Sequence, residues 1–402
     1  HLRLGALQPP LQDRVLICHV LHPSPCHPLH HRGDSSAAAL CYPAAATVGR
    51  HGRVLVGTHR VMIATPLEAE HVERIRREAP AGVEVIYEPD LLPPTRYIAD
   101  HNGVDDYLHT PEQARRWAEL LATADILFDF PPGGRHPREA SPNVGWIQTT
   151  SAGVGRAVAN MGIRPGEMII TTASGIHARP LTEFVFMVLL MVVKEYDRLR
   201  DDRVARRWVR FCSDELSGKT IAIVGPGRIG REVVRIARCF DMHPVATARD
   251  TRPERAAELG VERLYSRAEL HEMLGAADAV VLSAPHTPET ENIMDRAAFD
   301  ALKPGVVFIN IGRGPLVDED ALLNKLRDGT IRFAGLDVFR TEPLPPDSPF
   351  WDLPNVLVNP HSASTSDREN GRIVDIFLHN LDCYVDGRAD EMRNVLDVER
   401  MY

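Results

Sequence analysis

Three glycines, Gly225, Gly227 and Gly230, form the pattern G-x-G-x-x-G in the segment IAIVGPGRIG. The pattern directly follows an apolar run typical of a buried strand and opens a stretch with helical periodicity. In such a turn the first glycine permits the tight bend, the second lets the backbone approach a pyrophosphate, and the third packs the helix against the strand. The N–H groups and positive potential of the helix N-terminus then hold the anion. The turn therefore predicts a dinucleotide-binding site.

The residues about 20 positions beyond the turn bear on which dinucleotide binds. An NAD site usually offers an acid to the ribose 2′-hydroxyl, whereas an NADP site offers a cation to the 2′-phosphate. Here we expect the second strand to end at Thr247 and Ala248, and Arg249 follows at once. Asp250 would become the ribose acid if the strand ended one residue later. We expect NADP(H) to be favoured and leave NAD(H) open.

Arg313, Glu342 and His361 have the side chains that reduction of a 2-keto acid requires. This reaction needs a cation for the carboxylate, a proton donor for the carbonyl oxygen and a hydride donor beside the carbonyl carbon. Arg313 lies just past an expected strand end, where its guanidinium can bind a carboxylate through two hydrogen bonds. His361 can deliver the proton because imidazole titrates near working pH, and Glu342 can orient the imidazolium.

Each of these three residues also fits a role without chemistry. Arg313 could form a strand-end salt bridge, Glu342 could be a solvated loop acid, and His361 could cap a helix before Ser362. Only their combination with the glycine turn predicts an oxidoreductase that moves a hydride to or from a small acid.

Alternating strand and helix patterns position these residues. From about Val61 the chain reads as the strand VMIAT, a helix over 68–78 and the strand VEVIY, and later strands read AVVLSAP, VVFINIG and FAGLDVF. This alternation predicts doubly wound, mostly parallel sheets with helices on both faces. Ligands bind at the carboxyl ends of such strands, which is where Pro285, Arg313 and Asp337 stand.

Length and composition narrow the class of protein. A chain of 402 residues, 44% hydrophobic and 25% charged, predicts two globular domains. The net charge of -9, without basic runs, argues against nucleic acid as a partner. The longest apolar run, over 184–193, is shorter than the roughly 20 residues of a membrane span, so we expect a buried helix. Six cysteines form no disulfide framework, and with no signal peptide visible we expect a reducing cytoplasm.

The first 57 residues are rich in Pro, His, Ala and Cys and show no strand or helix period, so we expect a disordered extension. Thiolate and imidazole are the usual zinc ligands, and this segment carries a group of them. The group consists of Cys18, His19, His22, Cys26, His27, His30 and His31. Prolines interrupt it and its spacing matches no closed tetrahedral pattern, so we expect no metal site.

From about residue 60 to the C-terminus the chain resembles the D-isomer-specific 2-hydroxyacid dehydrogenase family, close to its glyoxylate and hydroxypyruvate reductase branch. The motifs that carry the resemblance are WIQTTSAGVG, GIHARPLTEFVFMVLL, SGKTIAIVGPGRIG, SAPHTPET, INIGRGPLVDEDAL, FAGLDVFRTEPLPPDSPFW, PNVLVNPHSA and NVLDVERMY. The resemblance implies that Arg313, Glu342 and His361 form the catalytic trio. Ala248 stands where the family commonly has Asp, a departure that bears on cofactor choice.

The resemblance also implies binding residues. The loop of Ser151, Ala152 and Gly153 would offer backbone N–H groups to the substrate carboxylate, and Phe130 with Pro131 would lie on a first substrate loop. Asp337 would bind the nicotinamide carboxamide. The full set of expected cofactor contacts is Gly225, Gly227, Arg228, Ile229, Gly230, Arg249, Pro285, Ile311 and Asp337.

The layout implied by the resemblance is discontinuous, with two Rossmann-like domains. A flavodoxin-like substrate domain, built from 58–155 and 364–402, would contain a dinucleotide-binding domain inserted over 156–363. Two long helices, over 181–194 and 373–385, would cross between the domains and allow closure. Such enzymes are usually homodimers.

Two other functions stay open. A dinucleotide-sensing binding protein, such as a transcriptional co-repressor, would use the same fold without turnover. Formate oxidation needs no proton donor to the substrate, and the acid at Glu342 argues against it because formate enzymes of similar sequence pair the histidine with an amide.

Overall fold

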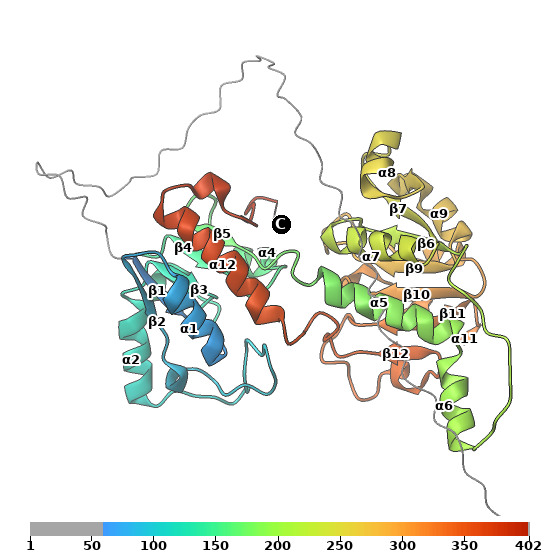
Figure 1. Cartoon of the computed structure of the whole chain (residues 1–402), viewed down its shortest axis with the longest axis horizontal. Coiled ribbons are helices and arrows are strands. Elements are labelled where there is room, and N and C mark those ends of the chain that lie inside the picture. The colour runs from blue at the N-terminus through green and yellow to red at the C-terminus, as the bar shows by residue number, and fades with distance from the viewer. Residues whose placement is uncertain (1–58, 401–402) are drawn as a thin grey trace, which may run out of the picture. The chain divides into compact units, whose positions relative to one another are not determined.

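The computed structural model describes residues 59–400, which form two lobes, each built on its own parallel sheet (Figure 1). The expected N-terminal extension, with its Cys and His residues, lies outside the described residues. Within residues 59–400, none of the helices combines the length and apolar composition that a bilayer crossing requires.

The first lobe, called here the five-stranded lobe, comprises residues 59–172 and 369–400. Its parallel strands lie in the order β2-β1-β3-β4-β5. Their bounds are β1 His59–Ile63, β2 Val83–Ile86, β3 Ile126–Phe128, β4 Trp146–Gln148 and β5 Ile169–Thr171. This order is flavodoxin-like, and the direction of winding reverses between β1 and β3.

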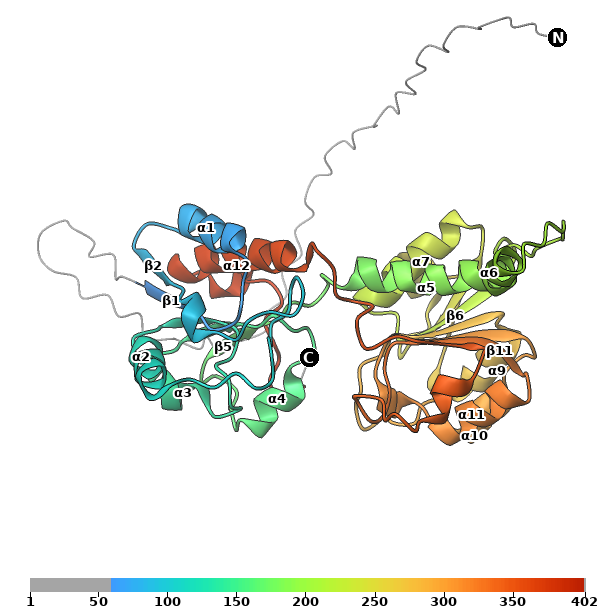
Figure 2. The same ribbon diagram turned by 90° about the horizontal axis from the view of Figure 1, so that it is seen from below.

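Helices cover both faces of this sheet (Figure 2). One face carries α1 and α12, and the other carries α2, α3 and α4. Their bounds are α1 Ala69–Glu78, α2 Pro111–Leu121, α3 Pro137–Ala140, α4 Gly155–Asn160 and α12 Glu369–Val385. Helix α2 begins at Pro111 because the Thr110 hydroxyl accepts a hydrogen bond from the Gln113 N–H, and proline suits the first helical position.

The C-terminal helix α12 completes the core of the five-stranded lobe. The ring of Phe377 stacks on the fully buried Trp146 at 5.2 Å between centroids and meets Phe128 edge-on at 5.1 Å. Strand β5 pairs with β4, so this sheet extends to Thr171 and the boundary that the sequence predicts at 155 falls too early.

The second lobe, called here the seven-stranded lobe, comprises residues 178–363. Its parallel strands lie in the order β12-β11-β10-β9-β6-β7-β8, which is the Rossmann order with one further strand. Their bounds are β6 Thr220–Val224, β7 His243–Thr247, β8 Arg263–Tyr265, β9 Ala279–Leu282, β10 Val306–Asn310, β11 Ile331–Leu336 and β12 Val356–Val358. The fold class predicted from the sequence, α/β with two doubly wound domains, is confirmed.

Helices α5 and α7 lie on one face of the seven-stranded sheet, and α10 and α11 lie on the other (Figure 2). The helix bounds are α5 Ala178–Val193, α6 Tyr196–Val204, α7 Arg228–Cys239, α8 Pro253–Leu259, α9 Leu270–Ala276, α10 Arg296–Asp300 and α11 Glu319–Arg327. Short 3₁₀ helices in the two lobes cover Pro89–Leu91, Arg267–Glu269, Gly314–Leu316, Pro349–Asp352 and Ala389–Glu391. The apolar run over 184–193 lies in α5 and is largely buried, as the sequence predicts.

Candidate active site

The glycine turn joins β6 to α7, and each of its glycines has a different environment. Gly225 has a φ of 96°, and a Cβ added there would lie 2.6 Å from the Ala284 backbone. A Cβ on Gly230 would lie 2.7 Å from the Gly225 carbonyl oxygen and 2.9 Å from Ile223 Cγ2. A Cβ on Gly227 would meet no atom within 4 Å. The first and third glycines are therefore required by the fold, while the second leaves an open side at the N-terminus of α7.

This difference yields a prediction for Gly227→Ala. The added methyl group meets no protein atom, and the φ of -73° suits any residue, so the melting temperature should stay within about 2 °C of wild type. The same methyl group would obstruct a pyrophosphate, so we expect dinucleotide affinity to fall by at least about tenfold. Thermal unfolding and a fluorescence titration with reduced cofactor measure the two effects. Equal affinity in the variant would contradict the assignment of the turn.

The residues after β7 bear on the choice of cofactor. Strand β7 ends at Thr247, and the Ala248 N–H donates to the Tyr265 carbonyl oxygen at 2.9 Å. Asp250 is engaged by Arg252 through two side-chain hydrogen bonds of 2.9 and 2.7 Å. These bonds, with that from the Arg252 backbone N–H, lower the pKa of Asp250 to about 2. Arg249 is exposed beside them.

The charge of Arg249 also acts on the loop after β9. The pKa of Glu289 in that loop is lowered mainly by a hydrogen bond from the Thr287 hydroxyl, and the charge of Arg249 adds to the effect. The Pro285 carbonyl oxygen in the same loop accepts a hydrogen bond from the Thr290 hydroxyl at 2.7 Å. The loop after β9 therefore lies within range of the charge of Arg249.

Three of the residues predicted to contact the cofactor also make contacts within the protein. Ile311 is 3% exposed and packs in the core, so a contact with the cofactor would have to come from its backbone. Ile229 packs partly against the core of the same lobe. The Arg228 guanidinium donates to the Ser174 carbonyl oxygen at 3.0 Å.

Arg313 follows β10 and is held by the loop around it. Its Nη1 donates to the Gly312 carbonyl oxygen at 2.7 Å, and the Asn310 side chain bonds to the Gly312 N–H and the Arg313 carbonyl oxygen. A Cβ added on Gly314 would lie 2.0 Å from the Phe339 carbonyl carbon and oxygen. The loops that follow β10 and β11 are therefore in direct contact.

Glu342 and His361 form a pair. His361 Nδ1 lies 2.8 Å from Glu342 Oε2, and Glu342 Oε1 accepts the Phe339 N–H at 2.9 Å. The carboxylate therefore keeps the proton on Nδ1, and Nε2 is the nitrogen left for exchange with a substrate. The side chains of both residues are partly exposed, as contact with a small molecule requires.

Asp337 organises the segment that carries His361. It follows β11 and is 2% exposed. Its Oδ1 accepts the Ala363 N–H at 3.0 Å and the Asn359 amide, while its carbonyl oxygen accepts the His361 N–H at 3.0 Å. His361 has a φ of 53°, a conformation that non-glycine residues rarely adopt and that these bonds maintain. Sequence reasoning missed Asn310 and Asn359, whose only signal is a position just at or past a strand end.

The predicted substrate loop follows β4 in the five-stranded lobe. Ser151, Ala152 and Gly153 are exposed, whereas Phe130 packs partly against the core. A Cβ added on Gly153 would lie 2.9 Å from Arg313 Nη2. The structure thus brings this loop to the guanidinium that we expect to bind a carboxylate.

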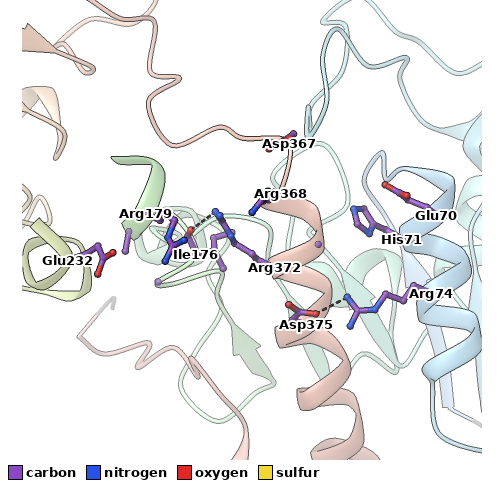
Figure 3. Close-up of a pocket in the computed structure, with 13 residues that line it drawn as sticks. Glu70, His71, Arg74, Ile176, Arg179, Glu232, Asp367, Arg368, Arg372 and Asp375 are labelled. Carbon is purple, nitrogen blue, oxygen red and sulfur yellow. Dashed lines mark hydrogen bonds and ion pairs between the residues drawn. The ribbon is translucent and has the colours of Figure 1, made fainter. Parts of the chain in front are cut away.

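A cavity of about 720 Å³ lies elsewhere, at the N-terminal ends of α5 and α12 (Figure 3). None of the three predicted catalytic residues lines it. Its charged groups are partly paired, since Arg74 Nη1 lies 2.7 Å from Asp375 Oδ1 and Arg372 donates to the Ile176 carbonyl oxygen at 3.2 Å. We therefore locate the candidate active site at the strand ends rather than in this cavity.

Comparison with known proteins shows which family the chain resembles. A family model for the NAD-binding domain of the D-isomer specific 2-hydroxyacid dehydrogenases matches residues 186–363. Glyoxylate/hydroxypyruvate reductase B of Citrobacter koseri is 42% identical over 290 residues, which are 70% of this chain and 87% of that relative. D-3-phosphoglycerate dehydrogenase of Mycobacterium leprae is 34% identical over 241 residues, 59% of this chain, and the match spans only 44% of that longer relative.

A solved structure of similar fold is the NADPH-dependent glyoxylate/hydroxypyruvate reductase of Sinorhizobium meliloti in complex with NADP and sulfate. It superimposes with a TM-score of 0.67 at 25% sequence identity and covers 86% of this chain and 100% of its own. With most of the Citrobacter reductase matched at 42% identity, the chain belongs to the D-isomer-specific 2-hydroxyacid dehydrogenase family.

Proposed function

We propose that this protein is an oxidoreductase that transfers a hydride between NAD(P)H and a small 2-keto acid, as a glyoxylate/hydroxypyruvate-type reductase. The observation that carries the proposal is the Glu342–His361 pair, 2.8 Å apart, in the lobe that holds the glycine turn. Arg313, Glu342 and His361 follow the adjacent strands β10, β11 and β12, at the sheet edge where such folds bind ligands. The relatives named as glyoxylate/hydroxypyruvate reductases support the substrate class.

In the proposed reaction each side chain has one task. Arg313 holds the substrate carboxylate and polarises the adjacent carbonyl group, with backbone N–H groups of Ser151 and Gly153 on the other side. His361 donates the proton on Nε2 to the carbonyl oxygen, and Glu342 stabilises the imidazolium before transfer. The residues of the glycine turn would hold a nicotinamide cofactor, which when bound would supply the hydride for the carbonyl carbon. The product is the D-2-hydroxy acid.

Turnover assays decide between this function and a binding protein without activity. Oxidation of NADPH and NADH is followed with glyoxylate, hydroxypyruvate and a series of bulkier 2-keto acids, and formate is tested with the oxidised cofactors. We expect the small 2-keto acids to be reduced. Absence of turnover with every acid, together with intact cofactor binding, would favour the dinucleotide-sensing alternative.

We further propose that NADP(H) is the preferred cofactor. Arg249 is exposed where a 2′-phosphate would lie, and Asp250 is engaged by Arg252 rather than available to a ribose. The Sinorhizobium reductase is itself described as NADPH-dependent.

Arg249→Ala should therefore lower kcat/KM with NADPH by about tenfold or more, because a charged hydrogen bond to phosphate is lost. Activity with NADH should change little. Arg252→Ala is the matched control. It releases Asp250 to bind a ribose, so we expect kcat/KM with NADH to rise relative to kcat/KM with NADPH. If Arg249→Ala lowers kcat/KM equally with both cofactors, Arg249 does not bind the 2′-phosphate.

A homodimer is also proposed as the functional form, in a reducing cytoplasm. Apolar side chains in and after α6 are exposed, including Val204 at 74% and Trp208 at 97%. Exposed apolar patches of this kind mark interaction surfaces, and a second copy of the chain would cover this one. Light scattering of the whole chain in solution measures the assembly.

A further inference from the structure

The carboxyl edge of the five-stranded sheet carries a group of polar residues without an assigned role. Thr65 follows β1, Asp129 follows β3 and Thr150 follows β4, and these three strands are neighbours. In a sheet of this order the winding reverses between β1 and β3, and connections leave that edge in opposite directions. Such a reversal opens a crevice in which ligands of doubly wound sheets bind.

Asp129 is the acid at this reversal, and the fold fixes its position. Its φ of 71° lies in the left-handed region, which non-glycine residues seldom occupy. Its N–H donates to the Gln148 carbonyl oxygen at 2.7 Å, and its Oδ1 accepts the Phe130 N–H at 2.8 Å. The Thr150 hydroxyl donates to its Oδ2. A residue with a strained backbone conformation that several hydrogen bonds hold in place is typical of functional sites.

His101 stands near Asp129 and is fixed as well. The Thr65 hydroxyl donates to the His101 carbonyl oxygen at 2.8 Å, and His101 Nε2 lies 2.6 Å from Asn370 Oδ1. The Asn370 amide in turn donates to Glu68 at 2.7 Å. Burial raises the pKa of Asp129, and the Thr150 hydroxyl, the Phe130 N–H and the charge of His101 oppose the rise without cancelling it. The acid is therefore desolvated, which strengthens any hydrogen bond that it accepts.

Contacts connect Asp129 to the site that binds the substrate carboxylate. Arg313 Nη2 meets the loop at Gly153, and Thr150, which bonds to Asp129, precedes this loop directly. A 2-keto acid whose carboxylate lies on Arg313 and whose carbonyl group faces His361 must direct its third carbon away from the seven-stranded lobe. In this pose the third carbon would lie on the side of the five-stranded lobe, whose loop after Thr150 meets Arg313.

We propose that Asp129 is a specificity-determining residue that accepts a hydrogen bond from a donor on the third carbon of the substrate. A carboxylate offers about four acceptor positions, and those on Asp129 are only partly used by Phe130 and Thr150. The site then selects a 2-keto acid with a hydroxyl group on that carbon over one with a methyl group, and it disfavours a second carboxylate through like charge. This inference rests on the proposed function and assigns its selectivity to one side chain.

The test compares hydroxypyruvate with pyruvate, which differ only in the hydroxyl group on the third carbon. We expect wild type to favour hydroxypyruvate in kcat/KM, and Asp129→Asn to reduce that preference by about tenfold or more, since an acceptor charge is lost. The change should lie mainly in KM for hydroxypyruvate. Activity with glyoxylate, which has no third carbon, should fall much less than activity with hydroxypyruvate. Asp105→Asn, in the same lobe with a side chain 94% exposed, is the control.

A purely structural role for Asp129 gives a different result. Activity with all three acids would then fall together and the hydroxypyruvate-to-pyruvate ratio would not move, which would overturn the inference. Binding provides a readout independent of turnover: calorimetry with reduced cofactor, which cannot take up a hydride from a hydroxy acid, compares D-glycerate with D-lactate, in wild type and in Asp129→Asn. If wild type reduces none of the acids, the proposed function fails, and the binding ratio still decides whether Asp129 recognises the hydroxyl group.

Discussion

Replacement of His361 by alanine should lower kcat by about 10²-fold or more while the affinity for reduced cofactor stays near the wild-type value. The imidazole is the group left to protonate the carbonyl oxygen once Glu342 occupies Nδ1 at 2.8 Å. Its side chain is 42% exposed, so water can enter the space left by the ring and supply a slow residual reaction. Steady-state kinetics and a fluorescence titration of cofactor measure the two quantities.

A variant of the partner residue serves as the graded control. Glu342→Gln keeps an oxygen that can accept the Nδ1 proton but removes the charge that stabilises imidazolium, so we expect a smaller loss of kcat than in His361→Ala. The Phe339 N–H should still find an acceptor in this variant. Near-normal turnover in His361→Ala would show that another group delivers the proton.

Gly314→Ala should damage stability and activity together. The added methyl group would lie 2.0 Å from the Phe339 carbonyl carbon and oxygen and 2.4 Å from the Arg340 nitrogen. These are backbone atoms that cannot rotate away, so the two loops must separate at a cost of about 1–3 kcal/mol or more. One loop begins with Arg313, and the other supplies the Phe339 N–H that anchors Glu342. Separation therefore misplaces two of the three proposed catalytic groups, and kcat/KM should fall by about 10²-fold.

Gly275→Ala is the control for Gly314→Ala, because an added methyl group at Gly275 would not overlap with backbone atoms. Gly275 lies in α9, and its added Cβ would be 3.3 Å from the Ala301 carbonyl oxygen, a distance that a small shift relieves. Alanine also favours the helix, so we expect little change in melting temperature or activity. A Gly314→Ala protein with normal activity would contradict the role assigned to the contact between the two loops. Denaturant unfolding and kinetics on both variants provide the measurements.

Features set by local pattern were predictable from the sequence. The glycine turn, the order of strands and helices and the strand-end positions of Arg313 and Asp337 follow from apolar runs and turn residues, which need no knowledge of distant segments. The family resemblance selected Glu342 and His361 from many acids and 18 histidines, and the structure brings the two side chains together.

Features set by contact between distant segments were not predictable. The approach of Gly314 to Phe339 and the bonds from Asp337 to the segment of His361 depend on neighbouring strands of one sheet. The pairing of β5 with β4, beyond the domain boundary predicted at 155, likewise joins segments that no local pattern relates. Asp250 and Arg252 are close in the sequence, but their spacing alone does not predict the ion pair. The pair forms because the two side chains point toward each other.

Because the five-stranded lobe needs helix α12, the cores of the two lobes are completed at different times during synthesis. The seven-stranded lobe is contiguous, so a nascent chain holds its complete core as soon as residue 363 has left the ribosome. The strands around Trp146 emerge much earlier, but Phe377, which stacks on that ring, emerges only after the whole seven-stranded lobe. Until then the five-stranded sheet presents an uncovered aromatic face, the kind of surface that chaperones bind and that aggregates. A stop codon before α12 would therefore leave one lobe folded and the other permanently unfinished.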